Sequence, residues 1–161
     1  MLREEFVNHS TAYRSPLPQV MRNEMPSDSS TEPVLLAVNG TLMRGLELNP
    51  NLLAVGASFV AEAWTSADYR LWSIEDRYPA MLRSPRGGAA IACELWAVPP
   101  AGLAQLLRRE PPGLVIGKVR LSDGHEVLGI LAEPFLCDHR LEITAFGGWR
   151  EFMASKNAAS R

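Results

Sequence analysis

The chain has 161 residues, a length that predicts about one domain with a hydrophobic core of its own. Its 47% hydrophobic and 21% charged residues are typical of a globular protein, and 16 basic against 18 acidic residues argue against binding to a phosphate backbone. No apolar run reaches the ~18 to 20 residues of a membrane span. The first thirty residues contain no apolar h-region of ~7 to 15 residues, so we expect no secretory signal. We therefore expect a cytoplasmic protein with neither membrane nor nucleic-acid partners.

The first 33 residues differ in composition from the remainder. They contain four prolines and a Ser-Asp-Ser-Ser-Thr tract at 27–31, and they show no periodic apolar face. Such a segment cannot offset its ordering entropy. We predict a disordered tail over 1–33, a folded domain over 34–155 and a C-terminal tail over 156–161. Translation starts at Met1, Met21 and Met25 are all compatible with this division.

Strand signals dominate the first half of the folded part. The apolar run 34–38 predicts a buried strand that ends at a turn containing Gly40. Asn49 before Pro50 predicts a short helical turn over 51–55, with the Asn49 side chain as its cap. Runs rich in β-branched, aromatic and small apolar residues predict three further strands, at 57–65, 69–74 and 89–98.

The second half combines two helices with a hairpin. Leucines at helical spacing after Pro100 predict an amphipathic helix that ends near Glu110. An Asp-Gly turn between the runs 114–121 and 126–132 predicts an antiparallel hairpin. Aromatic residues after Thr144 predict a terminal helix capped by that threonine. This order of elements predicts an α+β domain with two principal helices around a mixed or antiparallel sheet that can close into a barrel.

Metal and cofactor chemistry has little support in the sequence. Cys93 and Cys137 are isolated thiols, and the three histidines fall at unrelated spacings, so we expect no disulfide framework and no metal site. A phosphate-binding loop, a dinucleotide fingerprint and a serine-nucleophile motif are also missing from the sequence. No cofactor is therefore expected.

Three features of the sequence can carry chemistry. The turn 39–45 can direct backbone N–H groups at an anion, or it is an ordinary glycine turn out of a strand. Glu94 shares a strand face with Ala92 and Trp96, and is either paired with an arginine or the polar group of a cavity. Glu110, on the loop after the amphipathic helix, is a general base if it is buried in a pocket, and is otherwise a solvated carboxylate.

Several motifs follow one another in order along the folded part. Asn39-Gly40-Thr41-Leu42, Tyr78-Pro79-Ala80-Met81 and Glu94-Leu95-Trp96 are similar to elements of the γ-glutamylcyclotransferase-like superfamily. A closer resemblance, to the C-terminal domain of allophanate hydrolases, rests on the segments 68–72, 97–99, 117–124 and 143–150, the last with its Phe-Gly-Gly-Trp-Arg sequence. The resemblance implies a γ-glutamylcyclotransferase-like mixed β-barrel with one cavity, which acts on small amides or carboxylated ureas.

The resemblance also implies a set of site residues. Glu110 and Glu94 are the candidate catalytic groups. The candidate substrate-binding residues are Asn39, Gly40, Thr41, Leu42, Tyr69 and Tyr78. We expect the backbone N–H groups of Gly40, Thr41 and Leu42 to share a cavity with Glu94 or Glu110. The loop departs from both family patterns, because allophanate-type loops carry a histidine where Thr41 stands and cyclotransferase-type loops carry a tyrosine where Asn39 stands.

Three functional hypotheses are compatible with these residues. The leading one is a stand-alone allophanate-hydrolase C-terminal-like domain that binds a small carboxylated urea or amide in nitrogen-compound catabolism, with hydrolysis or decarboxylation left open. The second is a non-catalytic partner subunit of a separate amidase. The third is a γ-glutamyl cyclotransferase with Glu110 as base, for which Leu-Leu-Arg-Arg-Glu-Pro is an atypical context. A homodimer also stays open.

Overall fold

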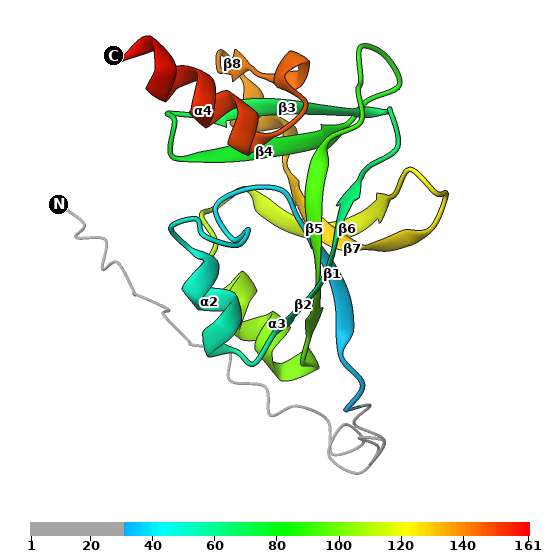
Figure 1. Cartoon of the computed structure of the whole chain (residues 1–161). Helices are drawn as coiled ribbons and strands as arrows, with labels where there is room; N and C mark the ends of the chain where they lie inside the picture. Colours follow the sequence, from blue (N-terminus) through cyan, green and yellow to red (C-terminus); the bar gives the residue numbers. More distant parts are fainter. Residues whose placement is uncertain (1–30) are drawn as a thin grey trace, which may run out of the picture. The chain divides into compact units, whose positions relative to one another are not determined.

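The structure is a computed structural model that describes residues 31–161 (Figure 1). The predicted tail up to residue 30, with its three candidate translation starts, lies outside the described residues. The described part contains a five-stranded sheet in the order β2-β5-β1-β7-β6 and a three-stranded sheet in the order β4-β3-β8. Together with its helices, these sheets confirm the predicted α+β class.

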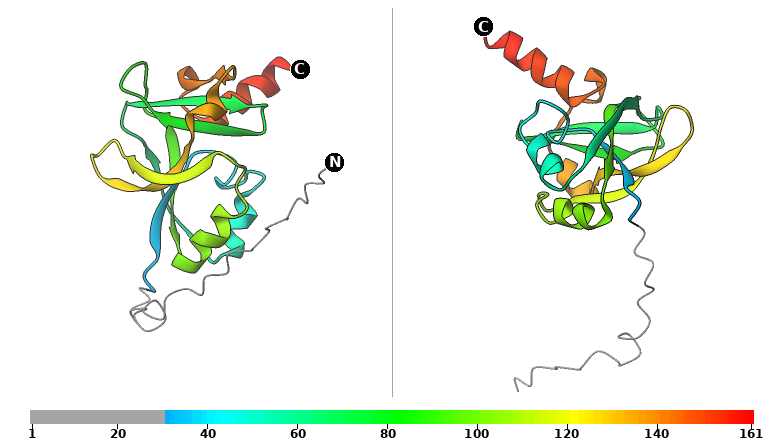
Figure 2. Two further views of the ribbon diagram at one scale, coloured as in Figure 1. Left: turned by 180° about the vertical axis from the view of Figure 1, so that it is seen from behind. Right: turned by 60° about the horizontal axis from the view of Figure 1, so that its bottom comes forward.

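The five-stranded sheet is built around β1 (Val34–Val38), which has the predicted bounds. It pairs antiparallel with β5 (Ala92–Val98) and parallel with β7 (Glu126–Ala132). The predicted hairpin is confirmed, because β6 (Leu114–Arg120) pairs antiparallel with β7 along its whole length. Both views in Figure 2 show this hairpin extending away from the helices α2 and α3. On the other side, β2 (Ser58–Trp64) is an edge strand paired with β5.

The two edges of this sheet approach each other at one end. Thr65 and Leu121 form an isolated antiparallel bridge, and Ser66 N donates to Arg120 O at 2.9 Å. The bridge joins the end of β2 to the end of β6, but no ladder continues from it within residues 31–161. The sheet is therefore strongly curved and is not a closed barrel, which corrects the expected barrel closure.

The three-stranded sheet contains two strands that were not predicted. β4 (Tyr78–Arg83) pairs with β3 (Tyr69–Ile74), and the short β8 (Leu141–Glu142) pairs with the other side of β3. Pro79 is tolerated in β4 because β4 is an edge strand. The turn before β4 places Glu75 and Asp76 at φ of 54° and 57°, a conformation for which Asn-Gly is the usual signal. Without that signal, the hairpin was not evident from the sequence.

The helices differ from the expectation at their ends. α2 spans Asn49–Ala54, α3 spans Pro100–Leu107 and α4 spans Trp149–Ala159. The Asn49 side chain does not cap α2; its Nδ2 donates to Leu42 O at 2.9 Å. Thr144 does not cap α4, which begins five residues later, and its Oγ1 accepts the Leu71 N–H at 2.9 Å. The helix also includes residues 156–159 of the predicted C-terminal tail.

The main core lies between the five-stranded sheet and the helices. Leu52 of α2 and Leu106 of α3 are fully buried against Leu36 of β1 and Trp96 of β5. Two short 3₁₀ helices, Pro134–Cys137 and Thr144–Phe146, flank β8. No helix within residues 31–161 has the length and apolar character needed to cross a membrane.

Candidate functional site

A cavity of about 510 Å³ opens where the loop after β1 meets the β3–β4 turn, the loop after α3 and the helix α4. The end of β1 and the loop after it contribute residues 38–42 and 46–48, and the β3–β4 turn with the start of β4 contributes residues 76–79. Glu110 and Pro111 form another part of the wall. The loop 39–42 and Glu110, which were predicted to share a cavity, therefore do so.

The loop 39–42 lines this cavity and carries three successive backbone donors at 40–42. Met43 N donates to Gly40 O at 3.0 Å and Leu48 N donates to Thr41 O at 3.0 Å, which folds the loop back on itself. In the part of the chain that the structure describes, the N–H groups of Gly40, Thr41 and Leu42 donate no hydrogen bond. Three successive amides in a cavity wall can bind a carboxylate or a developing oxyanion.

Buried amide side chains hold the loop in place. Asn39 is 4% exposed, and its Nδ2 donates to Ile130 O of β7 at 2.9 Å. On the far side, the Asn49 side chain binds Leu42 O. Gly40 packs closely against Pro79, since a Cβ at position 40 would lie 2.6 Å from Pro79 Cδ. Glycine is required at position 40 because of this close approach to Pro79. The backbone conformation does not require it, since the φ of Gly40 is outside the positive range.

Glu110 brings an ionisable group to the same cavity. Its backbone N–H donates to Leu107 O at 3.2 Å, which continues the last turn of α3 and orients the loop. Burial of the side chain raises the pKa of its carboxyl to about 6. Among residues 31–161 no side chain forms an ion pair with it. A carboxyl with a pKa near neutrality can both donate and accept a proton at physiological pH.

Glu94 lies outside the lining of this cavity, so the structure does not bring it together with Glu110. It is 2% exposed on β5 and accepts hydrogen bonds from the Arg44 N–H at 2.9 Å and from Trp96 Nε1 at 3.1 Å. It also forms ion pairs with Arg44 at 3.2 Å and with Arg150 of α4 at 2.9 Å. Burial alone would raise the pKa of Glu94, but these donors lower it below its usual value. Of the two interpretations of Glu94, pairing with arginine describes its environment.

The two candidate tyrosines occupy different environments. Tyr78 lines the cavity beside Pro79. Tyr69 is fully buried in the core, and its hydroxyl accepts the Arg120 N–H at 2.8 Å. Tyr69 is not part of the cavity lining, and the structure gives it a role in joining β3 to the end of β6.

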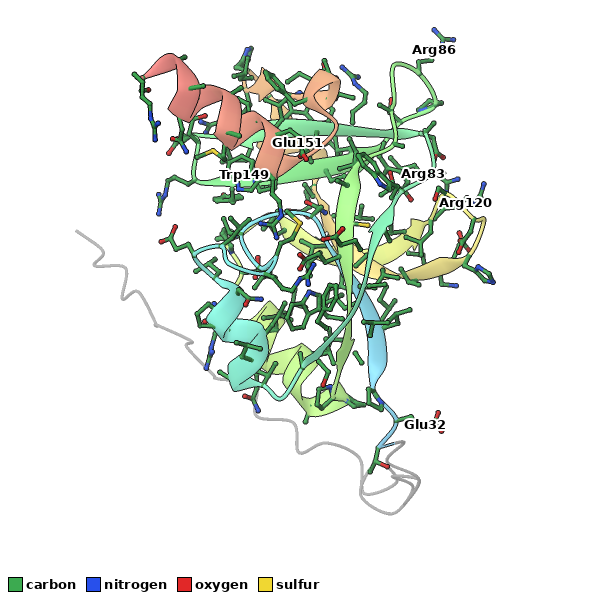
Figure 3. All side chains as sticks on the ribbon, viewed as in Figure 1. Glu32, Arg83, Arg86, Arg120, Trp149 and Glu151 are labelled. Atoms are coloured by element: carbon green, nitrogen blue, oxygen red, sulfur yellow. The ribbon has the colours of Figure 1, made fainter. Side chains whose placement is uncertain are left out.

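Other residues complete the cavity and were not identified from the sequence. Asp76 and Arg77 come from the β3–β4 turn, and Met153 and Trp149 come from α4. Trp149 is labelled in Figure 3. Asp76 forms an ion pair with Lys156 of α4 and accepts a hydrogen bond from Ser73; the Lys156 contact and then the Ser73 contact lower the pKa of Asp76. These contacts join segments far apart in sequence. Only Trp149 carried a local signal, as part of the Phe-Gly-Gly-Trp-Arg sequence.

Within residues 31–161, no group of three or more His, Cys, Asp or Glu side chains is arranged to hold a metal ion. Acid–base chemistry on a bound anion is one chemistry that the residues of the cavity can support. The amide donors of 40–42 and the carboxyl of Glu110 are its two components.

Comparison with known proteins identifies relatives that span only part of larger enzymes. Residues 34–154 match the family described as the allophanate hydrolase C-terminal domain. The urea amidolyase of Lachancea kluyveri is 28% identical over 135 residues, which are 80% of this chain but 7% of that enzyme.

Solved structures extend the comparison. The protein c4763, described as specific to uropathogenic E. coli, has a TM-score of 0.74 and 55% identity, and the match covers 75% of this chain and 95% of c4763. The allophanate hydrolase of Kluyveromyces lactis has a TM-score of 0.73 and 28% identity, with coverage of 81% of this chain and 22% of the enzyme. The likeness to the allophanate hydrolase C-terminal domain, stated from the sequence, is thereby confirmed.

Glu94→Gln tests the role of the paired carboxylate. The variant keeps the shape of the side chain but removes the charge and presents an NH₂ group to donors, so the free energy of unfolding at pH 7 should fall by about 2–4 kcal/mol. Because the folded-state pKa of Glu94 is lowered, its stabilisation is present above the unfolded pKa and is lost as the pH falls through the folded pKa. Urea unfolding, followed by tryptophan fluorescence, should show a difference that shrinks on acidification. Glu62→Gln, at an exposed partner of Arg44, should have a much smaller effect.

Glu110→Gln tests the burial of the second carboxyl. The folded-state pKa is raised to about 6, so an ionised Glu110 destabilises the fold above that pH, whereas both states are protonated below about pH 4. The variant should therefore increase the free energy of unfolding by about 1–2 kcal/mol at pH 7.5 and leave it unchanged at pH 4. Glu47→Gln, at an exposed position in the same cavity wall, is the control and should not show this gain. An equal effect of Glu110→Gln on the free energy of unfolding at both pH values would contradict a raised pKa of Glu110.

Proposed function

Because the chain belongs to the allophanate hydrolase C-terminal domain family, we propose that it acts as a stand-alone domain of this type, binding a carboxylated urea or amide in the cavity beside residues 39–42. One observation carries the proposal. The three amides of 40–42, which donate no hydrogen bond within residues 31–161, share a single cavity with the unpaired carboxyl of Glu110. An anion-binding group and a group that titrates near pH 6 are the minimum that such a reaction needs.

The amides and Glu110 have separate roles in this proposal. The N–H groups of Gly40, Thr41 and Leu42 donate hydrogen bonds to the ligand: they bind its carboxylate before reaction, and in hydrolysis they stabilise the negative charge that develops on a carbonyl oxygen. Loss of carbon dioxide from a carbamate breaks the N–C bond, and the nitrogen must gain a proton as the electron pair returns to it. Neutral Glu110 supplies this proton and recovers one from solvent. For hydrolysis, ionised Glu110 instead removes a proton from the attacking water.

The matched relatives support a role in nitrogen-compound catabolism, since they are parts of a urea amidolyase and of an allophanate hydrolase. A second candidate function is that of a partner subunit for a separate amidase. It is favoured by the edge strand β2, which exposes Phe59, Val60 and Trp64 at 37%, 50% and 49%. Exposed apolar side chains on a sheet edge are typical of a docking surface. The atypical sequence around Glu110 makes γ-glutamyl cyclotransferase activity the weakest of the three.

Gly40→Ala tests the anion-binding loop. The added Cβ would meet the ring of Pro79, so the loop must shift and its amides lose their alignment. The affinity for oxamate, a stable amide that bears a carboxylate, should fall about tenfold or more, as measured by NMR titration of the backbone amides. The double variant Gly40→Ala, Pro79→Ala removes the obstructing ring and should recover most of the affinity. Full oxamate affinity in the folded single variant would exclude this loop from binding.

Glu110→Gln tests the proton-transfer role. Release of ammonia or carbon dioxide from allophanate should fall on the order of 10²-fold, because the side-chain amide of glutamine cannot act as an acid or a base near neutral pH. Oxamate affinity should be retained. If the parent protein shows no turnover alone but supports turnover when an amidase is added, and Glu110→Gln behaves like the parent, the partner-subunit function replaces the catalytic one. Rapid release of 5-oxoproline from γ-glutamyl substrates, abolished by this substitution, would instead favour the cyclotransferase.

A further inference from the structure

The cavity is much larger than the ligand that its anion-binding loop requires. A carboxylated urea has only about seven non-hydrogen atoms, whereas 510 Å³ holds roughly seventeen water-sized groups at about 30 Å³ each. Cavities of about 300–1,000 Å³ are typical of sites for ligands of drug size. A ligand confined to the loop 39–42 would leave more than half of this volume to solvent.

The remaining wall is mainly apolar. Side chains of this kind come from the loop after β1, from β6 and β7 and from α4: Leu46, Leu48, Leu114, Ile130, Trp149 and Met153. Trp149 is 3% exposed and Ile130 is 7% exposed, so these two belong to fixed walls of the domain. Such a surface offers few hydrogen bonds to solvent and gains free energy when apolar ligand atoms cover it.

The charged side chains that line the cavity do not interrupt this apolar wall. Asp76 is paired with Lys156, and Glu110 is half-buried with a pKa of about 6. Arg77 and Glu47 are exposed, so they lie where the cavity meets solvent. The polar groups inside the cavity are therefore those of the loop 39–42, Glu110 and the half-buried Tyr78, while Asn157 is exposed at its edge. The volume beyond them is suited to apolar atoms.

We propose that the ligand of this cavity is a carboxylate-bearing amide or carbamate that carries an apolar substituent of several carbon atoms, rather than an unsubstituted carboxylated urea. This inference rests on the proposed function, because the loop 39–42 holds the carboxylate. The substituent extends along the wall formed by Leu46, Met153 and their neighbours. Binding free energy then comes from two separate parts of the ligand, the charged head and the apolar extension.

A series of linear carboxylates from acetate to hexanoate tests the proposal on the full chain. Dissociation constants are measured by NMR titration, which also reports whether the amides of Gly40, Thr41 and Leu42 shift. Each added methylene should tighten binding about two- to fourfold, as expected for burial of a methylene group. An affinity that stays constant from acetate to hexanoate, with shifts at 40–42, overturns the proposal and leaves the proposed function standing. Absence of any shift at 40–42 overturns both.

Two substitutions locate the apolar extension. Met153→Gln keeps the length of the side chain but places an amide in the cavity wall, so hexanoate affinity should fall several-fold while acetate affinity is unchanged. Leu53→Gln, at an exposed helical position outside the cavity lining, is the matched control and should change neither. An equal loss of hexanoate affinity in both variants would show that the carboxylates bind to exposed apolar surface, and would overturn the proposal.

Discussion

The buried carboxylate of Glu94 fixes the two walls between which the cavity lies. A charge that is 2% exposed must be paired and fully hydrogen-bonded to be tolerated. Its donors come from the end of the loop after β1, through Arg44, from Trp96 on β5 itself and from α4, through Arg150. Arg150 also donates to Arg44 O at 2.7 Å, so the loop and the helix are joined directly as well. Glu94 thus links the loop after β1 and α4, which both contribute to the cavity lining, to β5 of the sheet.

Glu94 and Glu110 show how different surroundings shift the pKa values of two residues of one type in opposite directions. Glu94 is surrounded by donors, which hold its pKa below the usual value despite burial. Glu110 is partly buried without such donors, and its pKa rises to about 6. Where the pKa values of two carboxyls are shifted in opposite directions, one commonly stays charged and the other transfers protons. Here they also occupy different places, since Glu94 stabilises the fold behind the loop and only Glu110 lines the cavity.

The volume of the cavity depends on contacts between distant parts of the chain. The β3–β4 turn places Asp76 in a left-handed conformation, and its carboxylate pairs with Lys156 in α4. This pair connects residues 80 positions apart and holds the helix beside the turn. Trp149 and Met153 of the same helix line the cavity together with the loop 39–42. The position of α4 therefore contributes to the volume of the cavity.

Local patterns were sufficient to predict β1, β3, β7 and the hairpin of β6 and β7, because apolar runs and an Asp-Gly turn act within a few residues of one another. The expectation that the loop 39–42 shares a cavity with Glu94 or Glu110 came with the family resemblance, and the structure places Glu110 there. Tertiary structure alone decided that Glu94 faces two arginines and that Tyr69 is a core residue, since Arg44 and Arg150 lie 50 and 56 positions from Glu94. Instead of capping helices as predicted, Asn49 and Thr144 form hydrogen bonds with Leu42 and Leu71, which lie 7 and 73 positions away. A side chain's partners, and hence its charge state and role, are set by packing that no local pattern contains.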